Sequence, residues 1–165
     1  MQDDIRDIEK MYDSSVEVED ARLDKNQLEF DITWRHLTRY LPASGSILEI
    51  GAATGRYTIE LCKLGYNVTA VDISSRLLDR CRSRLMADGL AQQARCIVAD
   101  ARDLSAIEDK QYDAVLVMGP LYHLILEEDR VAALQQAIDR LKHGGLIVSA
   151  FLSRLGLMGH LLRTK

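Results

Sequence analysis

Residues 47–74 hold two short apolar runs, separated by a glycine-rich turn and a helical pattern. The first run carries Glu49 and leads into the turn, and the second ends in Asp72. This order predicts a strand–helix–strand unit, in which the two strands are parallel neighbours in one sheet. Gly51 and Gly55 allow the turn to adopt positive φ and let a ligand approach the backbone. Asp72 follows Gly51 by 21 residues, which suits hydrogen bonds from a ribose diol and predicts a site for a ribose-bearing ligand.

The same alternation continues along the chain. Strands are expected at residues 47–50, 67–71, 95–99, 112–118 and 146–151, and helices at residues 24–41, 55–64, 74–87 and 127–143. Nearly continuous apolar strands between helices predict a parallel sheet that is covered on both faces. In the first helix, Asp24 is the expected N-cap, and Leu28, Ile32 and Leu37 are expected near one face. The last helix is expected to end at His143, because its final residues are basic.

Composition excludes several classes of protein. The chain has 165 residues and a net charge of −4, which predicts one domain without a broad basic face for nucleic acid. No apolar run approaches the length of a membrane span, and the charged N-terminus is unlike a signal peptide. Three cysteines without a CxxC pair predict free thiols, and the four histidines have no metal-ligand spacing. We therefore expect a cytoplasmic protein with no metal, no membrane and no nucleic-acid partner.

The turn sequence GAATGRY separates two classes of ribose-bearing ligand. A dinucleotide site favours the pattern G-x-G-x-x-G, with a pyrophosphate at the helix N-terminus. Here Ala53 replaces the middle glycine, and the bulky Tyr57 stands where close helix packing is expected. The carboxylate of Glu49 is a poor neighbour for a pyrophosphate. It suits a ligand that carries an ammonium or a sulfonium group, so a nicotinamide-dependent oxidoreductase is the less favoured interpretation.

Five segments in register resemble the motifs of the class I S-adenosylmethionine-dependent methyltransferases. They are LEIGAATGRYT, VDIS, VADARDL, YDAVLVMGPLYHL and LKHGGLIVSAF, and they span residues 47–151. The resemblance implies the Rossmann-like, doubly wound and mostly parallel α/β sheet of that family. The segment GPLYHL resembles a bacterial subfamily associated with small-molecule methylation. Its members also carry Tyr-Asp and Arg-Leu pairs ahead of a helix, which Tyr12-Asp13 and Arg22-Leu23 match.

The resemblance also implies roles for the residues that follow the strands. Glu49 would hold the ammonium group of the cofactor, Asp72 its ribose hydroxyls and Asp100 its adenine amino group. The remaining cofactor contacts are expected from small and apolar residues of the same turns: Gly51, Ala52, Ala53, Gly55, Ile73, Ala101, Met118 and Gly119. The alternative interpretations are a surface acid for Glu49 and turn or helix caps for Asp72 and Asp100.

Methyl transfer needs alignment and exclusion of water more than it needs a particular side chain. Tyr122 and His123 follow the fourth strand and are the candidate catalytic residues. His123 could act as a base where the nucleophile must lose a proton, and its alternative is a packing or hydrogen-bonding role. Tyr12 and Arg22 are the candidates for substrate or lid contacts, with a solvated charge as the alternative for Arg22.

The resemblance divides the chain into an N-terminal helical lid at 1–41, a cofactor-binding core at 42–151 and an apolar tail at 152–165. The class I fold continues past its fifth strand into an antiparallel hairpin, so the resemblance implies a C-terminally truncated version with about five strands. An uncovered fifth strand predicts a second copy or a partner chain at that edge. A fragment, a paired protein and a domain that has lost catalysis all remain open.

The expected function is methyl transfer from S-adenosylmethionine, with S-adenosylhomocysteine as product, to an oxygen or nitrogen of a small molecule. The alternative is a non-catalytic or split subunit that binds the cofactor and needs a partner chain. Nucleic-acid methylation is less favoured, because GPLY stands where the type that acts on flipped bases has Asn-Pro-Pro-Tyr.

Overall fold

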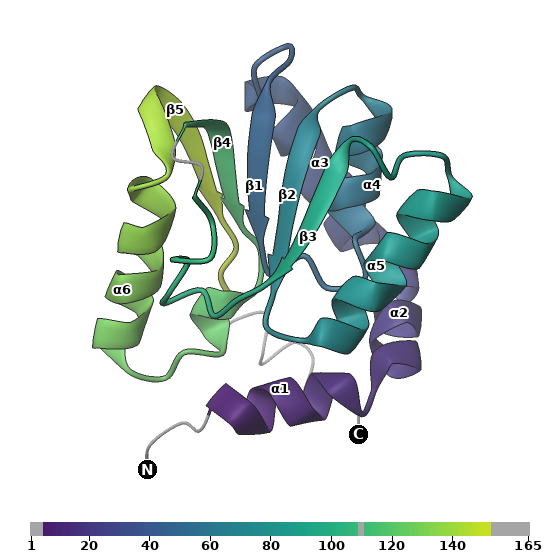
Figure 1. Cartoon of the computed structure of the whole chain (residues 1–165), viewed down its shortest axis with the longest axis vertical. Coiled ribbons are helices and arrows are strands. Elements are labelled where there is room, and N and C mark those ends of the chain that lie inside the picture. Colours follow the sequence, from purple (N-terminus) through teal and green to yellow (C-terminus); the bar gives the residue numbers. More distant parts are fainter. Residues whose placement is uncertain (1–4, 109–110, 153–165) are drawn as a thin grey trace.

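The computed structural model describes residues 5–108 and 111–152. These residues form a mixed α/β fold whose strands and helices alternate after an N-terminal helical segment (Figure 1). The elements are α1 Ile5–Asp13, α2 Val16–Lys25, α3 Gln27–Tyr40, β1 Ser46–Ile50, α4 Arg56–Lys63, β2 Asn67–Asp72, α5 Ser75–Ala87, β3 Ala94–Val98, β4 Tyr112–Val117, the 3₁₀ turn η1 Pro120–Tyr122, α6 Glu127–Ile138 and β5 Leu141–Ser149.

The five strands form one sheet in the order β3-β2-β1-β4-β5. Every neighbouring pair is parallel, which confirms the expected doubly wound sheet. From β1 the chain builds outward through β2 and β3 on one side and through β4 and β5 on the other. The strand order therefore reverses between β1 and β4, and ligands of open α/β sheets bind at the carboxyl ends of the strands beside such a point.

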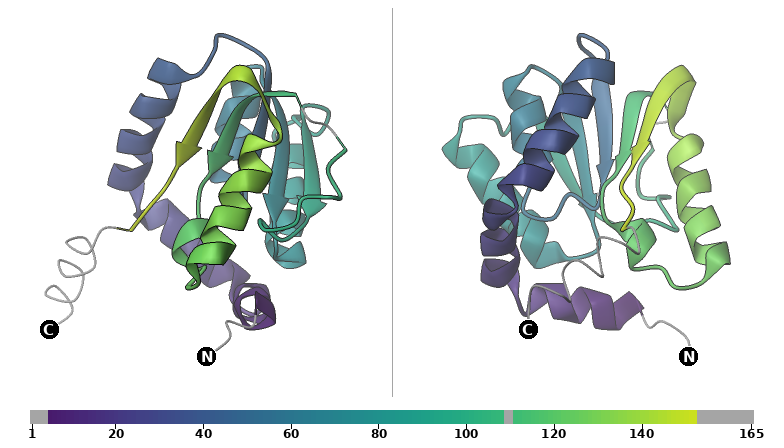
Figure 2. Two further views of the ribbon diagram at one scale, coloured as in Figure 1. Left: turned by 90° about the vertical axis from the view of Figure 1, so that its left-hand side faces the viewer. Right: turned by 180° about the vertical axis from the view of Figure 1, so that it is seen from behind.

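Helices cover both faces of the sheet (Figure 2). One core cluster joins α3, α4 and α5 to the sheet, and it includes Leu37, Leu61 and Leu85. A second cluster joins α6 and the segment after β3 to the opposite face. Along β1 successive side chains alternate between the two clusters, with Ile47 in the first and Leu48 in the second. This alternation follows from the two-residue period of a strand.

The first two helices lie over the edge at which the strands end. In both figures α1 crosses below the carboxyl ends of the sheet, with α2 beside α5. Ser74 donates a hydrogen bond of 2.5 Å to Asp13, at the end of α1. Asp20 in α2 accepts from Arg80 at 2.9 Å and from Arg84 at 2.8 Å. Polar contacts to α5 and to its N-cap residue therefore hold the N-terminal segment in place.

Two expected boundaries are wrong at the C-terminal side. The last helix ends at Ile138 rather than His143, and the fifth strand is Leu141–Ser149 rather than 146–151. Tyr112 pairs with Leu141 and Ala114 pairs with Leu146 across an irregularity in the ladder. Backbone pairing with β4 therefore places Lys142 and His143 in β5. The helix dipole, which favours bases in a last turn, is a weaker effect than these ladder hydrogen bonds.

The first predicted helix also differs from the structure. Residues 23–25 belong to α2, and α3 begins at Gln27, so Asp24 is not an N-cap. Leu28 and Ile32 are 74% and 49% exposed, whereas Leu37 is buried as expected. The inner face instead carries Phe30 and Trp34, whose rings stack with centroids 5.6 Å apart. Both rings are partly buried and pack against the core cluster that contains Leu37, and large aromatic side chains contribute strongly to such packing.

β5 forms one edge of the sheet, and no further strand pairs with it among residues 5–108 and 111–152. Ile147 in this strand is 36% exposed. Of the expected apolar tail at 152–165, only Leu152 lies within the described residues. No helix in the described part of the chain is long and apolar enough to cross a membrane.

Candidate functional site

A cavity of about 270 Å³ lies between the carboxyl ends of the strands and α1. Of the site residues predicted from the sequence, only Gly55 does not line it. All the other predicted site residues line the cavity: Tyr12, Arg22, Glu49, Gly51, Ala52, Ala53, Asp72, Ile73, Asp100, Ala101, Met118, Gly119, Tyr122 and His123. The fold brings these residues together because parallel strands end at the same edge of the sheet.

The glycine-rich turn after β1 has two glycines with different roles. Gly51 has φ 85°, and a Cβ there would lie 2.7 Å from Cδ of Pro120. Its missing side chain lets the turn approach the loop that follows β4. Gly55 has φ 86° and precedes α4, where a Cβ would collide with Sγ of Cys81. Gly55 therefore allows the turn to pack closely against α5, and it does not line the cavity.

Ala53 and Asp72 link this turn to the end of β2. Ala53 has φ 48°, a left-handed conformation that is costly for a residue with a Cβ. Its backbone amide donates to Oδ2 of Asp72 at 2.8 Å, and the amide of Ser74 donates to Oδ1 at 2.9 Å. Burial raises the pKa of Asp72, whereas these amide donors lower it. A carboxylate has about four acceptor positions, so Asp72 can also accept from ligand hydroxyl groups.

Glu49 is an acid in the middle of a buried strand. Only 1% of it is exposed, and the hydroxyl of Thr58 donates to its Oε2 at 2.5 Å. Burial raises the pKa of Glu49 to about 8, and the hydrogen bond from Thr58 opposes this shift. A cation beside Glu49 would favour the charged carboxylate. Because Glu49 is buried, its alternative interpretation as a surface acid is wrong. Its carboxylate can instead pair with an ammonium group.

Asp100 lines the cavity from the segment after β3. The guanidinium of Arg102 pairs with both carboxylate oxygens of Asp100, and the shortest contact, Nη2 to Oδ2, is 2.7 Å. The adjacent Ala101 is buried. Asp100 is therefore a fixed acceptor that lines the cavity from the segment after β3.

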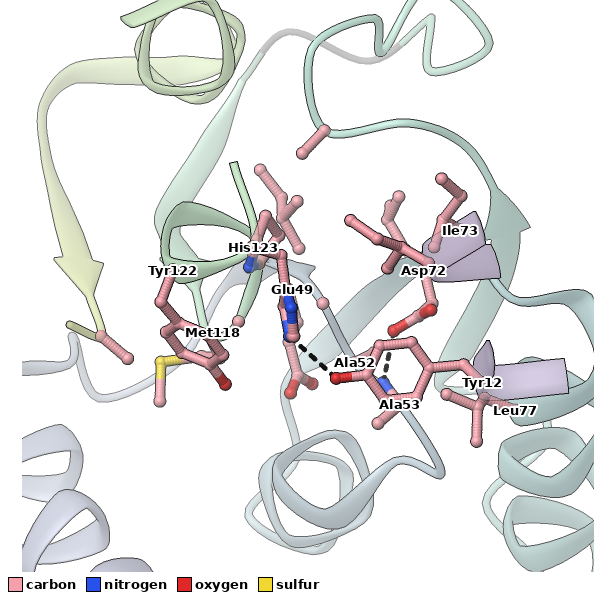
Figure 3. A pocket seen from close by; sticks show the side chains of 18 of the residues that line it. Tyr12, Glu49, Ala52, Ala53, Asp72, Ile73, Leu77, Met118, Tyr122 and His123 are labelled. Carbon is pink, nitrogen blue, oxygen red and sulfur yellow. Dashed lines mark hydrogen bonds between the residues drawn. The ribbon is translucent and has the colours of Figure 1, made fainter. Parts of the chain in front are cut away.

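Tyr12 and His123 meet across the cavity, although they are 111 residues apart in the sequence. The Tyr12 hydroxyl lies 2.8 Å from Nε2 of His123, and Figure 3 shows Tyr12 extending toward the imidazole. Burial lowers the pKa of His123 and raises the pKa of Tyr12. Both shifts favour the neutral groups, so Tyr12 donates and Nε2 accepts. The Tyr122 ring lies beside the imidazole, with centroids 4.8 Å apart.

Arg22 lines the same cavity and is bound within its own helix. Its Nε and Nη2 donate to the carboxylate of Glu19 at 2.7 and 2.5 Å. The pKa of Arg22 is raised, chiefly by these hydrogen bonds. Glu19 is only 7% exposed. The pair brings a partly exposed guanidinium and a buried acid to the cavity beside Tyr12.

Sequence reasoning missed several lining residues. Ile5 and Ile8 in α1 line the cavity together with Tyr12. Their spacing of three and seven residues places them on one helical face, so this pattern could have identified the inner face of α1. Tyr57 also lines the cavity and stacks on Phe30 with ring centroids 5.3 Å apart. No local sequence signal indicates that pairing, because it depends on how α3 packs against α4.

In the part of the chain that the structure describes, no group of three or more His, Cys, Asp or Glu side chains is arranged to hold a metal ion. The cavity instead presents separate acids at the ends of successive strands. Its remaining lining is largely apolar or aromatic, and such a lining suits an organic ligand.

Comparison with known proteins identifies a family. The family model described as "Methyltransferase domain" matches residues 47–145. A curated relative is the tRNA 5-carboxymethoxyuridine methyltransferase of Escherichia coli K12, which is 28% identical over 142 residues. That match covers 82% of this chain and 52% of the relative. The chain therefore spans about half the length of this curated relative.

Two solved structures resemble the fold. The PH0226 protein from Pyrococcus horikoshii OT3 has a TM-score of 0.73 at 23% identity, over 83% of this chain and 63% of that one. The glycopeptide N-methyltransferase MtfA, crystallised with S-adenosylmethionine, has a TM-score of 0.63 at 27% identity, over 73% of this chain and 53% of that one.

Proposed function

This chain belongs to the methyltransferase domain family. From that premise we propose that it binds S-adenosylmethionine in the cavity between the strand ends and α1, and that it methylates an oxygen or nitrogen of a small molecule. The carrying observation is the convergence of three acids, Glu49, Asp72 and Asp100, at the ends of β1, β2 and β3 around one cavity. Each matches a different polar part of that cofactor.

The residues present fit the cofactor. Glu49 is the buried acid that an ammonium group would charge, and Asp72 has acceptor positions left for the ribose hydroxyls. Asp100, in the segment after β3, accepts the adenine amino group. Ile73 packs against the base, while Ala101 offers its backbone amide to a ring nitrogen. The cavity is also close in size to known small-molecule sites.

Further lining residues complete the cofactor site. Gly51 and Ala52 offer backbone contacts to the methionine part, where a side chain at Gly51 would collide with Pro120. Met118 and Gly119 form the floor near the methyl group.

When bound, S-adenosylmethionine supplies an electrophilic methyl group on a sulfonium. The protein aligns the nucleophile and keeps water away. Ile5, Ile8 and Tyr12 of α1 line the cavity, so we assign the N-terminal helices the role of a lid. Arg22, beside Tyr12, is positioned to meet a carboxylate of the cofactor or of the acceptor.

His123 is the proposed base for acceptors that must lose a proton. Its imidazole is neutral, so Nε2 has the lone pair that this role requires. The Tyr12 hydroxyl occupies that lone pair at 2.8 Å. An acceptor hydroxyl or amine would therefore replace Tyr12 as the partner of Nε2 and transfer its proton there. Tyr122 shapes the acceptor side of the cavity beside His123.

A small acceptor is favoured by the charge of the cavity and of the chain. The net charge is −4, whereas a nucleic-acid surface needs a basic patch. Two basic side chains near the lid, Arg80 and Arg84, already pair with Asp20. A tRNA acceptor is the second candidate, because one relative carries that activity in its name. The other alternative is a split subunit whose partner covers β5.

The first experiment is calorimetric titration of the chain with S-adenosylmethionine and S-adenosylhomocysteine, with NAD as control. We expect binding of the first two and none of NAD, and loss of that binding in Asp72→Ala. Asp79→Ala is the matched control, because Asp79 lies on the outer side of α5 and does not line the cavity. Folded protein that binds neither methionine derivative would overturn the cofactor assignment.

Transfer of a labelled methyl group then separates the acceptors. Turnover with small amines or phenols, and none with bulk tRNA, supports the proposal. Labelling of tRNA alone would favour the second candidate. Cofactor binding without turnover on any acceptor would favour the split subunit.

A further inference from the structure

Arg102 does not line the cavity. It contacts Asp100, the acid to which we assign the adenine amino group. Its Nη2 donates to Oδ2 of Asp100 at 2.7 Å, and its Nε lies 3.1 Å from each of the two oxygens. The backbone amide of Arg102 adds a bond of 2.9 Å to Oδ1. One residue therefore fixes both the position and the rotation of the Asp100 carboxylate.

The same guanidinium also reaches α6, which lies outside the cavity lining. Nη1 of Arg102 donates to Asp129 at 3.0 Å, in the first turn of α6. In the next residue of α6, Arg130 donates to the backbone carbonyls of Leu124 and Ile125 at 2.7 and 2.6 Å. These carbonyls belong to the loop that follows Tyr122 and His123. Arg102 thus joins the segment after β3 to the helix that anchors the acceptor-side loop.

Burial makes this arrangement more than a surface ion pair. The side chains of Arg102, Asp100 and Asp129 are 25%, 26% and 22% exposed. Partly buried, bidentate pairs between Arg and carboxylate hold their geometry better than exposed pairs do. The bonds from Arg102 use most of the acceptor positions of Asp100. They leave Asp100 a restricted direction in which to accept a further donor.

We propose that Arg102 is a positioning residue that orients Asp100 to select a 6-aminopurine, and that it couples this selection to α6. The inference rests on the proposed function, because it assumes that the adenine end of the cofactor lies at Asp100. A correctly rotated carboxylate accepts from an exocyclic amino group and repels a carbonyl oxygen at the same position. A free Asp100 could turn away from that oxygen and would discriminate less.

The guanidinium is the group that this role requires. Its planar fork binds both oxygens of Asp100 through Nε and Nη2 and still has Nη1 for Asp129. A lysine ammonium could neutralise Asp100, but it is a point charge and cannot hold the rotation of a carboxylate. Arg102→Lys is therefore expected to preserve the charge and lose the selectivity.

The test compares the dissociation constants of S-adenosylhomocysteine and S-inosylhomocysteine, which differ at purine position 6. We expect the wild-type protein to prefer the adenosyl ligand by about 10-fold or more, the size of one polar mismatch to a charged group. Arg102→Met and Arg102→Lys should each reduce this ratio to about 3-fold or less. Asp129→Asn, which keeps Arg102 and weakens its outer anchor, should give an intermediate ratio.

Arg82→Met is the matched control, since Arg82 forms an ion pair on α5 and does not line the cavity. Thermal unfolding of each variant shows whether it is folded. Folded Arg102 variants that retain the wild-type ratio, or that lose affinity equally for both ligands, would overturn the positioning role. A wild-type protein that binds neither ligand would instead refute the proposed function.

Discussion

Glu49 shows how burial on a central strand changes the protonation of an acid. It lies in β1, where its neighbours Leu48 and Ile50 are fully buried. A strand with helices on both faces has no solvent-facing side, so an acid on it is buried whichever way it points. The carboxyl group then keeps its proton to a higher pH, because burial disfavours the charged form.

This burial predicts a pH dependence of stability in the ligand-free protein. The pKa of Glu49 is about 8 in the folded chain, against 4.5 as the ordinary value. Between about pH 5 and 8, Glu49 is therefore protonated in the folded state and ionised in the unfolded state. The free energy of unfolding falls as pH rises through this window, by at most about 1.4 kcal/mol per unit. Urea unfolding of wild type and Glu49→Gln across the window measures it.

We expect the free energy of unfolding of Glu49→Gln to depend less on pH than that of wild type in this window, because an amide does not titrate. The control is Glu60→Gln in α4, which removes an acid that is 38% exposed and pairs with Lys63. It should keep the wild-type slope. Equal slopes in wild type and Glu49→Gln would show that Glu49 is already ionised at neutral pH.

The two N-terminal helices are attached unevenly to the rest of the molecule. Toward α5 they are held by Asp13 and Asp20, and Arg84 also contacts Thr54 in the glycine-rich turn at 3.3 Å. Across the cavity, the Tyr12–His123 hydrogen bond joins α1 to the loop after β4. Polar contacts on the α5 side and the Tyr12–His123 hydrogen bond on the other side therefore hold the lid, and weakening either attachment should speed its opening.

Breaking the attachment to α5 should release the cofactor faster. Asp20→Asn removes the charge that pairs with Arg80 and Arg84. Ion pairs that are this exposed each stabilise a protein by about 1 kcal/mol or less. We therefore expect dissociation of S-adenosylhomocysteine to accelerate by about 3- to 10-fold, with little change in global stability. Stopped-flow displacement measures the rate at low and high salt.

Asp79→Asn provides the comparison, because it breaks the Asp79–Arg82 pair within α5 and leaves the lid contacts intact. Its dissociation rate should match that of wild type. Raising the salt concentration should accelerate wild type and leave Asp20→Asn nearly unchanged, since screening weakens the same ion pairs. Equal rates in Asp20→Asn and wild type would show that the α2–α5 pairs do not retain the ligand.

At the scale of the whole molecule, the sheet has two different edges. β3 and β5 each pair on one side only, within residues 5–108 and 111–152. β5 exposes Ile147, and the segment after it exposes Phe151 at 67% and Leu152 at 70%. Unpaired strand edges with apolar side chains favour association with another chain. A second copy at β5 is therefore the proposed homotypic contact.

Sedimentation velocity at rising protein concentration tests this contact. We expect wild type to associate and Ile147→Lys to remain monomeric, because a charge at the edge opposes strand pairing. Val98→Lys on β3 is the control at the opposite edge, where Val98 is 45% exposed. It should associate like wild type. A monomeric wild type at all concentrations would refute a homotypic contact at β5 and leave a different partner chain as the alternative.

The order of strands and helices, and the positions of the acids that follow the strands, could be predicted from the amino-acid sequence. Local periodicity identifies each element, and parallel strands must end at one edge of a sheet. Glu49, Asp72 and Asp100 could therefore be assigned to one site without coordinates. The glycine-rich turn could also be located, although the left-handed conformation of Ala53 was not predicted.

The contacts between distant side chains could not be predicted, because they depend on how the elements pack in three dimensions. The contacts of Tyr12 with His123 and of Arg102 with Asp129 join segments that local patterns treat separately. The same holds for the end of α6, where pairing of β5 with β4 overrides the basic helix-end signal. These outcomes depend on long-range packing and ladder hydrogen bonds, whose energies exceed the local preferences that a sequence pattern expresses.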